Sequence, residues 1–310
     1  MAVANRQIIA DVLCETAPED KNLVVLCSDS RGSGSMTGFF NKFPEQAIEV
    51  GIAEQDLVSI SAGLAACGKH PFAVSPASFL SARSVEQIKV DVCYSKTNVK
   101  LVGISGGVSY GALGMSHHAC QDIAMVSAIP NIRVYIPSDM YLTRFLTEKL
   151  VRDDKAAYIR VSRNPSEIVY DENTEFEFDR TVRVRDGNDA TIIACGELVS
   201  TAKKAAELLA EEGTDVRVLD MYCIKPIDKE AIIKVARETG NIVTVEEHSV
   251  IGGLGSMVAS ITAENHPCKV RILGLPDEEL ICGTQQEIFE HEKLTPEGIA
   301  DEVRKLIRKQ

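Results

Sequence analysis

Apolar and polar positions follow two different rhythms along the chain. Residues 6–16, 53–67 and 139–151 place apolar side chains at helical spacing, and short continuous apolar runs lie between such segments. Short apolar runs separated by helices are typical of a parallel sheet that is buried on both faces. The pattern therefore predicts an α/β fold with helices on both faces of the sheet. Strands are expected at residues 22–27, 47–50, 72–74, 99–103, 132–136 and 157–161.

A polar stretch separates this series from a second one. Residues 166–180 are acidic and show little periodicity, so we expect a linker there. A first domain then covers residues 1–165, and a second α/β domain covers residues 181–310. In the second domain, strands are expected at 190–194, 216–219 and 242–245, and helices at 199–212 and from about residue 255.

The segment Gly252-Gly253-Leu254-Gly255 lies between a predicted strand and a predicted helix. A glycine-rich turn in that position can bind phosphate at the helix N-terminus. The third glycine of the dinucleotide-binding fingerprint is missing, however, which favours simple tight packing over nucleotide binding.

Composition and charge exclude several classes of protein. The chain has 310 residues, 45% of them hydrophobic, and can bury a sizeable core. A net charge of −12 offers no basic field to nucleic acid or to an anionic membrane. No run reaches 18 apolar residues, and the N-terminus shows no signal-peptide pattern. Nine cysteines form no Cys-x-x-Cys pair, and most (Cys27, Cys67 and Cys195 among them) are expected to be reduced core thiols, so we expect a cytoplasmic protein.

Loops at the carboxyl ends of strands are where α/β folds usually bind ligands, and two such loops come early in the chain. Residues 28–35 are rich in glycine and hydroxyls and include Ser33; they form either an anion-binding loop or a flexible connection. Glu54 opens a helix that is otherwise apolar. Its carboxylate either holds a proton at a site shielded from water or interacts with the helix dipole, an interaction worth roughly 0.3–1 kcal/mol.

Two later loops also carry candidate residues. Residues 103–118 contain five glycines and end in His117 and His118, which indicates either close backbone approach to a ligand or a solvated surface loop. Adjacent side chains on an extended chain point apart, so we do not expect this histidine pair to bind a metal. Residues 160–164 include Arg163, which suits either recognition of an anion or an ordinary salt bridge in a linker.

Several short segments together carry a family resemblance. They are Gly51-Ile52-Ala53-Glu54-Gln55, Ser78-Phe79-Leu80, Gly114-Met115-Ser116-His117, Ser162-Arg163 and the stretch 245–256. From residue 6 onward the chain resembles the C-terminal half of transketolase. The resemblance implies a pyrimidine-binding domain followed by a transketolase C-terminal domain, and thiamine diphosphate as cofactor. The Gly-Asp-Gly motif that grips the diphosphate through Mg²⁺ or Ca²⁺ has no counterpart here. The resemblance therefore implies a separate N-terminal subunit that binds the metal, and an α2β2 heterotetramer.

The resemblance also implies roles for individual residues. Glu54 would hydrogen-bond N1′ of the cofactor's aminopyrimidine ring and help to generate the reactive thiazolium carbon. Phe79 would stack on that ring, and Ile52 would lie beside the cofactor. A second family aromatic falls near Val85, so stacking is expected to be thinner here. No residue of this chain is assigned to a metal.

Substrate contacts follow from the same resemblance. Arg6, Ser33 and Arg163 match the clamp for a sugar phosphate, and His117 matches the histidine that contacts the donor hydroxyls. Two positions depart from the family pattern. The family has an acidic residue where this chain has Leu113, and a histidine near the position of Ser105. The donor is therefore left open, with a sulfonate tail as an alternative to phosphate.

The function expected from these observations is transfer of a two-carbon ketol unit from a ketose to an aldose acceptor. Three alternatives remain: a split 1-deoxyxylulose-5-phosphate synthase, the β subunit of a 2-oxoacid dehydrogenase, and a non-catalytic scaffold. The arginine that the synthase carries in its glycine-rich loop is absent, since Gly106 and Gly107 occupy that neighbourhood. The second domain is expected to build subunit contacts rather than chemistry.

Overall fold

Seven strands form the first of two sheets, in the order β10-β5-β6-β4-β3-β1-β2. The computed structural model describes residues 2–308. All neighbouring strands of this sheet are parallel except β10 and β5. The strands are β1 Leu23–Cys27, β2 Ala47–Glu49, β3 His70–Pro76, β4 Lys100–Ile104, β5 Arg133–Tyr135, β6 Ala157–Val161 and β10 Cys223–Lys225.

Helices cover both faces of this sheet because its central strands are apolar on both sides. In β1, Val24 and Leu26 belong to one hydrophobic cluster, whereas Leu23, Val25 and Cys27 belong to another. One face carries α1 (Asn5–Thr16), α2 (Thr37–Lys42) and α7 (Met140–Leu150). The other carries α3 (Glu54–Ala66), α4 (Ala77–Arg83), the π-helix η2 (Ile88–Tyr94) and α6 (Asp122–Ser127). Short elements are η1 (Pro44–Gln46), α5 (Val85–Gln87) and η3 (Gly111–Leu113).

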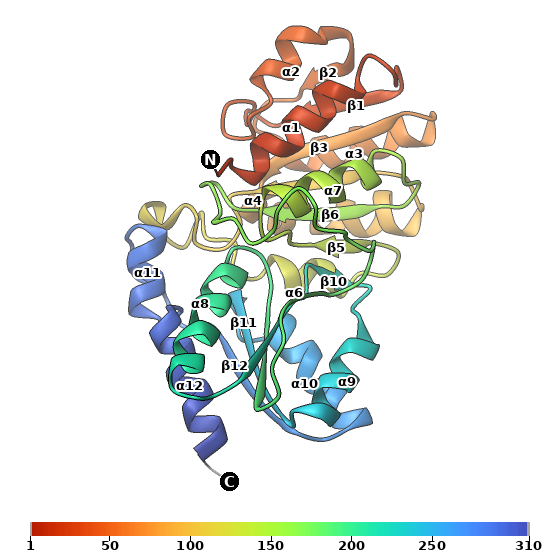
Figure 1. The fold of residues 1–310 in the computed structure, drawn as a ribbon. Helices are drawn as coiled ribbons and strands as arrows, with labels where there is room; N and C mark the ends of the chain where they lie inside the picture. The colour runs from red at the N-terminus through yellow and green to blue at the C-terminus, as the bar shows by residue number, and fades with distance from the viewer. Residues whose placement is uncertain (1, 309–310) are drawn as a thin grey trace.

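The second sheet has five strands in the order β12-β11-β8-β9-β7, and only β7 is antiparallel to its neighbour. Figure 1 shows α8 and α12 on one side of this sheet and α9 and α10 on the other. The strands are β7 Val182–Arg185, β8 Ala190–Ala194, β9 Val216–Asp220, β11 Asn241–Ser249 and β12 Lys269–Leu275. The helices are α8 Leu198–Glu211, α9 Lys229–Glu238, α10 Leu254–Asn265, α11 Gln285–His291 and α12 Pro296–Arg308.

The two halves of the chain are tied together by polar groups as well as by packing. Residues 164–181 form no helix or strand, yet they lie against the first sheet. Asp139, which caps α7, accepts backbone N–H bonds from Val169 and Tyr170 at 2.9 Å. Asp220, at the end of β9, accepts hydrogen bonds from Ser138 and from the Tyr170 hydroxyl. These bonds fix the orientation of the second sheet relative to the first.

The α/β fold and the helices on both faces are confirmed, and each strand expected from an apolar run overlaps an observed strand. Three strands have no counterpart in the prediction: β7, β10 and β12. Of these, β10 is only three residues long and pairs with β5 from about ninety positions away. One expectation about cysteines is wrong, because Cys67 lies exposed at the end of α3, whereas Cys27 and Cys195 are buried.

No helix among residues 2–308 has the length and apolar character needed to cross a membrane.

Asp220 provides a stability test of the contact between the halves. Burial raises the pKa of Asp220 from 3.8 to about 7, and nearby Asp139 adds to the shift. Because the folded pKa exceeds the unfolded one, the stability that depends on this proton is complete below the unfolded pKa and is lost as the pH rises through 7. Relative to Asp220→Asn, the wild-type free energy of unfolding should fall by about 2–3 kcal/mol between pH 5 and pH 8. Urea titrations at several pH values measure it, and parallel curves would contradict it.

Candidate active site

Glu54 lies at the first position of α3, with only 2% of its surface exposed. Leu57 and Val58, which follow Glu54 in α3, are buried in one of the hydrophobic clusters and anchor the start of the helix. One carboxylate oxygen lies 2.5 Å from a guanidinium nitrogen of Arg83, on α4. A buried carboxylate is costly unless it has such a partner, and Arg83 supplies one for Glu54.

Three rings, each in contact with the next, lie beside this ion pair. The guanidinium of Arg83 also lies over the ring of Phe79, 4.8 Å from its centroid. Phe79 meets the His117 ring edge-on at 5.1 Å, and His117 in turn meets Tyr110 edge-on at 5.8 Å. The imidazole of His117 is therefore held between two aromatic side chains, which fixes its orientation at the mouth of the loop.

Two arginines and the backbone carbonyl of Ser33 complete the row. The Arg163 guanidinium lies 4.7 Å from the centroid of Tyr110. Arg6, on α1, donates a hydrogen bond to the Arg163 carbonyl at 2.9 Å and another to the Ser33 carbonyl. Burial lowers the pKa of Arg6, and the charge of Arg163 adds to this effect. Two cations held this close favour an anionic ligand that would relieve their repulsion.

These contacts form one connected group, which we call the site row. It runs from a buried carboxylate at one end, through three rings, to a cationic end. Its members are Glu54, Arg83, Phe79, His117, Tyr110, Arg163, Arg6 and Ser33.

Several residues considered from the sequence lie outside the site row. Ile52 is 75% exposed and Leu113 is 55% exposed, on the surface around the row. Ser105 is fully buried with a left-handed backbone (φ 55°), and its hydroxyl has no hydrogen-bond partner within residues 2–308. Val85 packs against the core. His118 is buried and makes a separate contact from that of His117, because its Nε2 lies 3.2 Å from the Gly111 carbonyl oxygen.

The glycines of residues 103–118 serve packing within the protein rather than approach to a ligand. A Cβ on Gly103 would meet the Tyr158 ring, and one on Gly106 would overlap Arg160. Gly107 has a φ of 57°, and a Cβ there would lie 2.1 Å from the Glu247 side chain. The ligand-approach interpretation of these three glycines is therefore wrong. They let the loop that carries His117 lie directly on buried charged groups.

Those charged groups join the loop to the second half of the chain. Glu247, on β11, accepts hydrogen bonds from the Val108 N–H and from Gln285, both at 2.8 Å. Arg160 lies 3.2 Å from Asp122 and donates to the Glu247 carbonyl at 2.7 Å. Its guanidinium is thus engaged by protein groups. Of the two arginines in residues 160–164, only Arg163 belongs to the site row.

Two acids in this cluster are close enough to share a proton. Burial raises the pKa of Glu247, and the neighbouring Glu197 raises it further. Burial also raises the pKa of Glu197, which shares the Gln285 amide with Glu247. A proton held between the carboxyls replaces charge repulsion with a hydrogen bond. This arrangement lets the cluster stay buried beneath the loop.

The glycine-rich turn before α10 is occupied by the protein's own carboxylate. Glu246 accepts hydrogen bonds from the backbone N–H groups of Leu254 and Gly255, both at 2.7 Å. A Cβ on Gly253 would overlap Glu246 as well. The amides that could have held a phosphate are therefore satisfied, in agreement with the packing interpretation.

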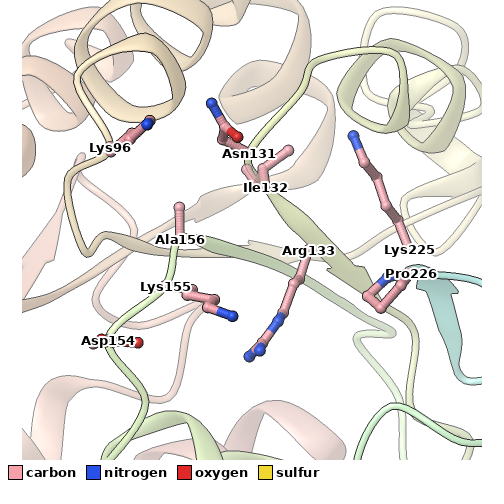
Figure 2. A pocket seen from close by; sticks show the side chains of 9 residues that line it. All are labelled: Lys96, Asn131, Ile132, Arg133, Asp154, Lys155, Ala156, Lys225 and Pro226. Carbon is pink, nitrogen blue, oxygen red and sulfur yellow. The ribbon is translucent and has the colours of Figure 1, made fainter.

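A cationic hollow lies at the opposite edge of the first sheet, near the starts of β5 and β6 (Figure 2). Its volume is about 490 Å³, and no member of the site row lines it. Arg133 pairs there with Asp153 at 2.9 Å, and Lys225 donates to the carbonyls of Ser127 and Ile129. Two of its four cations thus serve to hold β5 and β10.

Among residues 2–308 no group of three or more His, Cys, Asp or Glu side chains is arranged to hold a metal ion.

Comparison with known proteins assigns the fold to a family. Residues 1–167 match the model of the transketolase pyrimidine-binding domain, and residues 179–299 match that of the transketolase C-terminal domain. The chain belongs to the transketolase family, and the resemblance carried by its short segments is confirmed. Its fold is that of transketolase: a pyrimidine-binding domain followed by a C-terminal domain.

Relatives of similar length include separate subunits of transketolases. An apulose-4-phosphate transketolase subunit of Phocaeicola vulgatus is 48% identical over 99% of this chain and 98% of its own length. A 6-deoxy-6-sulfo-D-fructose transketolase subunit of a Clostridium species is 38% identical over 88% of this chain and 84% of its own. A solved split-gene transketolase, an inactive β4 tetramer, is 36% identical with a TM-score of 0.89 and covers 99% of both chains. The chain is thus a transketolase-type subunit.

Sequence reasoning missed two members of the site row, Arg83 and Tyr110. Arg83 follows Phe79 by four positions, and in a helix that spacing brings two side chains together, so this contact could have been found. Tyr110 lies in an irregular loop, where residue type and spacing give no comparable signal.

Gly107 tests whether the loop depends on its close contact with Glu247. Gly107→Ala adds a Cβ at a left-handed position against Glu247 and Arg160, and should lower the free energy of unfolding by about 2–4 kcal/mol. The matched control is Gly63→Ala in α3, where a Cβ meets nothing within 4 Å and should be neutral or slightly stabilising. Chemical denaturation measures both, and His117 ring NMR signals should shift only in Gly107→Ala. Equal stability of the two variants would be evidence against the packing role.

Proposed function

We propose that this chain is the C-terminal subunit of a thiamine-diphosphate-dependent transketolase that transfers a two-carbon ketol unit from a ketose with an anionic tail to an aldose. The observation that carries the proposal is the site row. It presents a buried carboxylate beside an aromatic ring at one end and a pair of arginines at the other. His117 lies between these two ends, in ring contact with Phe79 and Tyr110.

The carboxylate end fits an aminopyrimidine ring. A flat ring with a basic nitrogen needs a face to stack on and a buried acid within hydrogen-bond reach, and Phe79 and Glu54 offer these on neighbouring elements. When bound, thiamine diphosphate supplies the carbon nucleophile that takes up the ketol unit. Glu54 holds or gives a proton at the ring nitrogen, and its burial keeps that proton from exchanging freely with water.

The other groups act on the sugar. His117 is oriented by Phe79 and Tyr110, so its imidazole can hydrogen-bond the hydroxyls of the donor and move a proton there. Arg6 and Arg163, with Ser33, would hold the anionic tail. Their fixed positions suit either phosphate or sulfonate, and the tails named for the two relatives above are of both kinds.

A second subunit completes the site in this proposal. Ile52, Leu113 and Met115 are large apolar side chains exposed around the site row, and such residues are typical of a surface that a partner covers. We propose that an N-terminal transketolase subunit covers them and holds the diphosphate with Mg²⁺ or Ca²⁺. Two copies of each subunit would form an α2β2 heterotetramer, and Ile52 would then lie beside the cofactor. The boundaries 1–165, 166–180 and 181–310 remain our proposal for the domains.

Glu54→Gln tests the catalytic assignment. The amide keeps the shape of the side chain but cannot supply the proton, so kcat of the two-subunit complex should fall at least about 100-fold. Asp56→Asn is the matched control, because Asp56 lies in the same turn of α3 and is exposed. Ketol transfer is measured after size-exclusion chromatography confirms assembly. Near-normal kcat in Glu54→Gln would refute the role, and CO₂ release from pyruvate would favour the synthase or dehydrogenase alternatives.

Arg163→Ala tests the clamp. KM should rise at least tenfold for a donor with an anionic tail, with a small effect on kcat, since the tail is held in both the ground and transition states. Arg237→Ala, on the exposed face of α9, serves as the control. Steady-state kinetics with phosphate, sulfonate and uncharged-tail donors separates the cases. An unchanged KM for every donor would remove Arg163 from the clamp.

A further inference from the structure

Arg83 makes two contacts that the proposed function assigns to a different molecule. Its guanidinium pairs with the Glu54 carboxylate at 2.5 Å and lies over the Phe79 ring at 4.8 Å. Glu54 and Phe79 are the two groups proposed to bind the aminopyrimidine ring. A planar guanidinium offers both a flat face and N–H donors, which are the features that an aminopyrimidine also presents.

The same two contacts cannot be made by both groups at once. The Glu54 carboxylate is only 2% exposed and is already paired with Arg83, and the same guanidinium lies over the Phe79 ring. A planar ring that takes both contacts must therefore displace the guanidinium. Arg83 itself has a side chain that is 45% exposed, so it has solvent to move into. Arg83 is the last residue of α4, and the backbone of the following Ser84 is no longer helical.

We infer that Arg83 is a gate for the pyrimidine subsite: in the chain without its partner it occupies the place of the ring, and it withdraws toward solvent when the cofactor binds. The inference rests on the proposed function. It gives Arg83 a purpose in the free subunit, where an unpaired buried carboxylate would be strongly destabilising. The ion pair keeps Glu54 satisfied until a ring nitrogen replaces the guanidinium.

The test uses the full chain alone and the aminopyrimidine half of the cofactor, 4-amino-5-hydroxymethyl-2-methylpyrimidine. This fragment needs only Glu54 and Phe79, so no partner subunit or metal is required. Isothermal titration should give a Kd at least tenfold lower for Arg83→Ala than for the wild type, because the fragment no longer displaces the guanidinium. Circular dichroism verifies that the variant is folded.

Three further variants control the comparison. Arg83→Lys keeps a positive charge beside Glu54 but has no planar group to cover the Phe79 ring. Its Kd for the fragment should therefore lie between those of the wild type and Arg83→Ala. The double variant Glu54→Gln/Arg83→Ala should lose the gain, because the gain depends on the freed carboxylate. Arg144→Ala, which removes a surface ion pair with Glu15, should leave the Kd unchanged. Arg83→Lys also serves if Arg83→Ala does not fold.

The outcomes separate the gate from the function on which it rests. Equal Kd values for wild type and Arg83→Ala, or no binding to either at millimolar fragment, would overturn the gate. If the two-subunit complex nevertheless transfers ketol units and depends on Glu54, the proposed function stands without it. If the fragment result holds but the complex transfers no ketol unit, the site binds the ring and the proposed function fails.

Discussion

One buried carboxylate links α3 and α4 at the candidate site. Glu54 sits at the start of α3 with almost no contact with water, so a partner for its carboxylate is a condition of the fold. In the isolated chain that partner is Arg83, and the same guanidinium rests on Phe79. The stability of this corner and the ring binding that we propose for it therefore depend on the same carboxylate.

The second half of the chain contributes to the same corner indirectly. Glu247 and Gln285 hold the loop of residues 105–118 from below, and glycines in that loop let it lie on them without a side chain between. These contacts position His117, because the orientation of its ring depends on the path of the loop. These bonds are contacts within the chain, and the expectation that the second domain builds subunit contacts rather than chemistry stays a prediction.

The sequence was informative where local pattern determines structure, and less so where distant groups meet. The apolar helix after Glu54 left two roles open for this acid, one shielded from water and one at the helix dipole, and Glu54 is buried. The glycines at 103, 106 and 107 suggested a ligand, yet their neighbours are Tyr158, Arg160 and Glu247, which come from strands far along the chain. No local pattern encodes that meeting, just as none encodes β10 joining the first sheet. The roles of the predicted site residues stay predictions, although most of them lie in one connected row.

The central claim is that Glu54 shares a proton with the pyrimidine nitrogen of thiamine diphosphate. The most direct measurement is ¹⁵N NMR of N1′-labelled cofactor bound to the two-subunit complex. The N1′ resonance should move from its free position toward that of a protonated ring nitrogen, and Glu54→Gln should abolish most of this change. A resonance that stays at the free position in the wild-type complex would contradict the account.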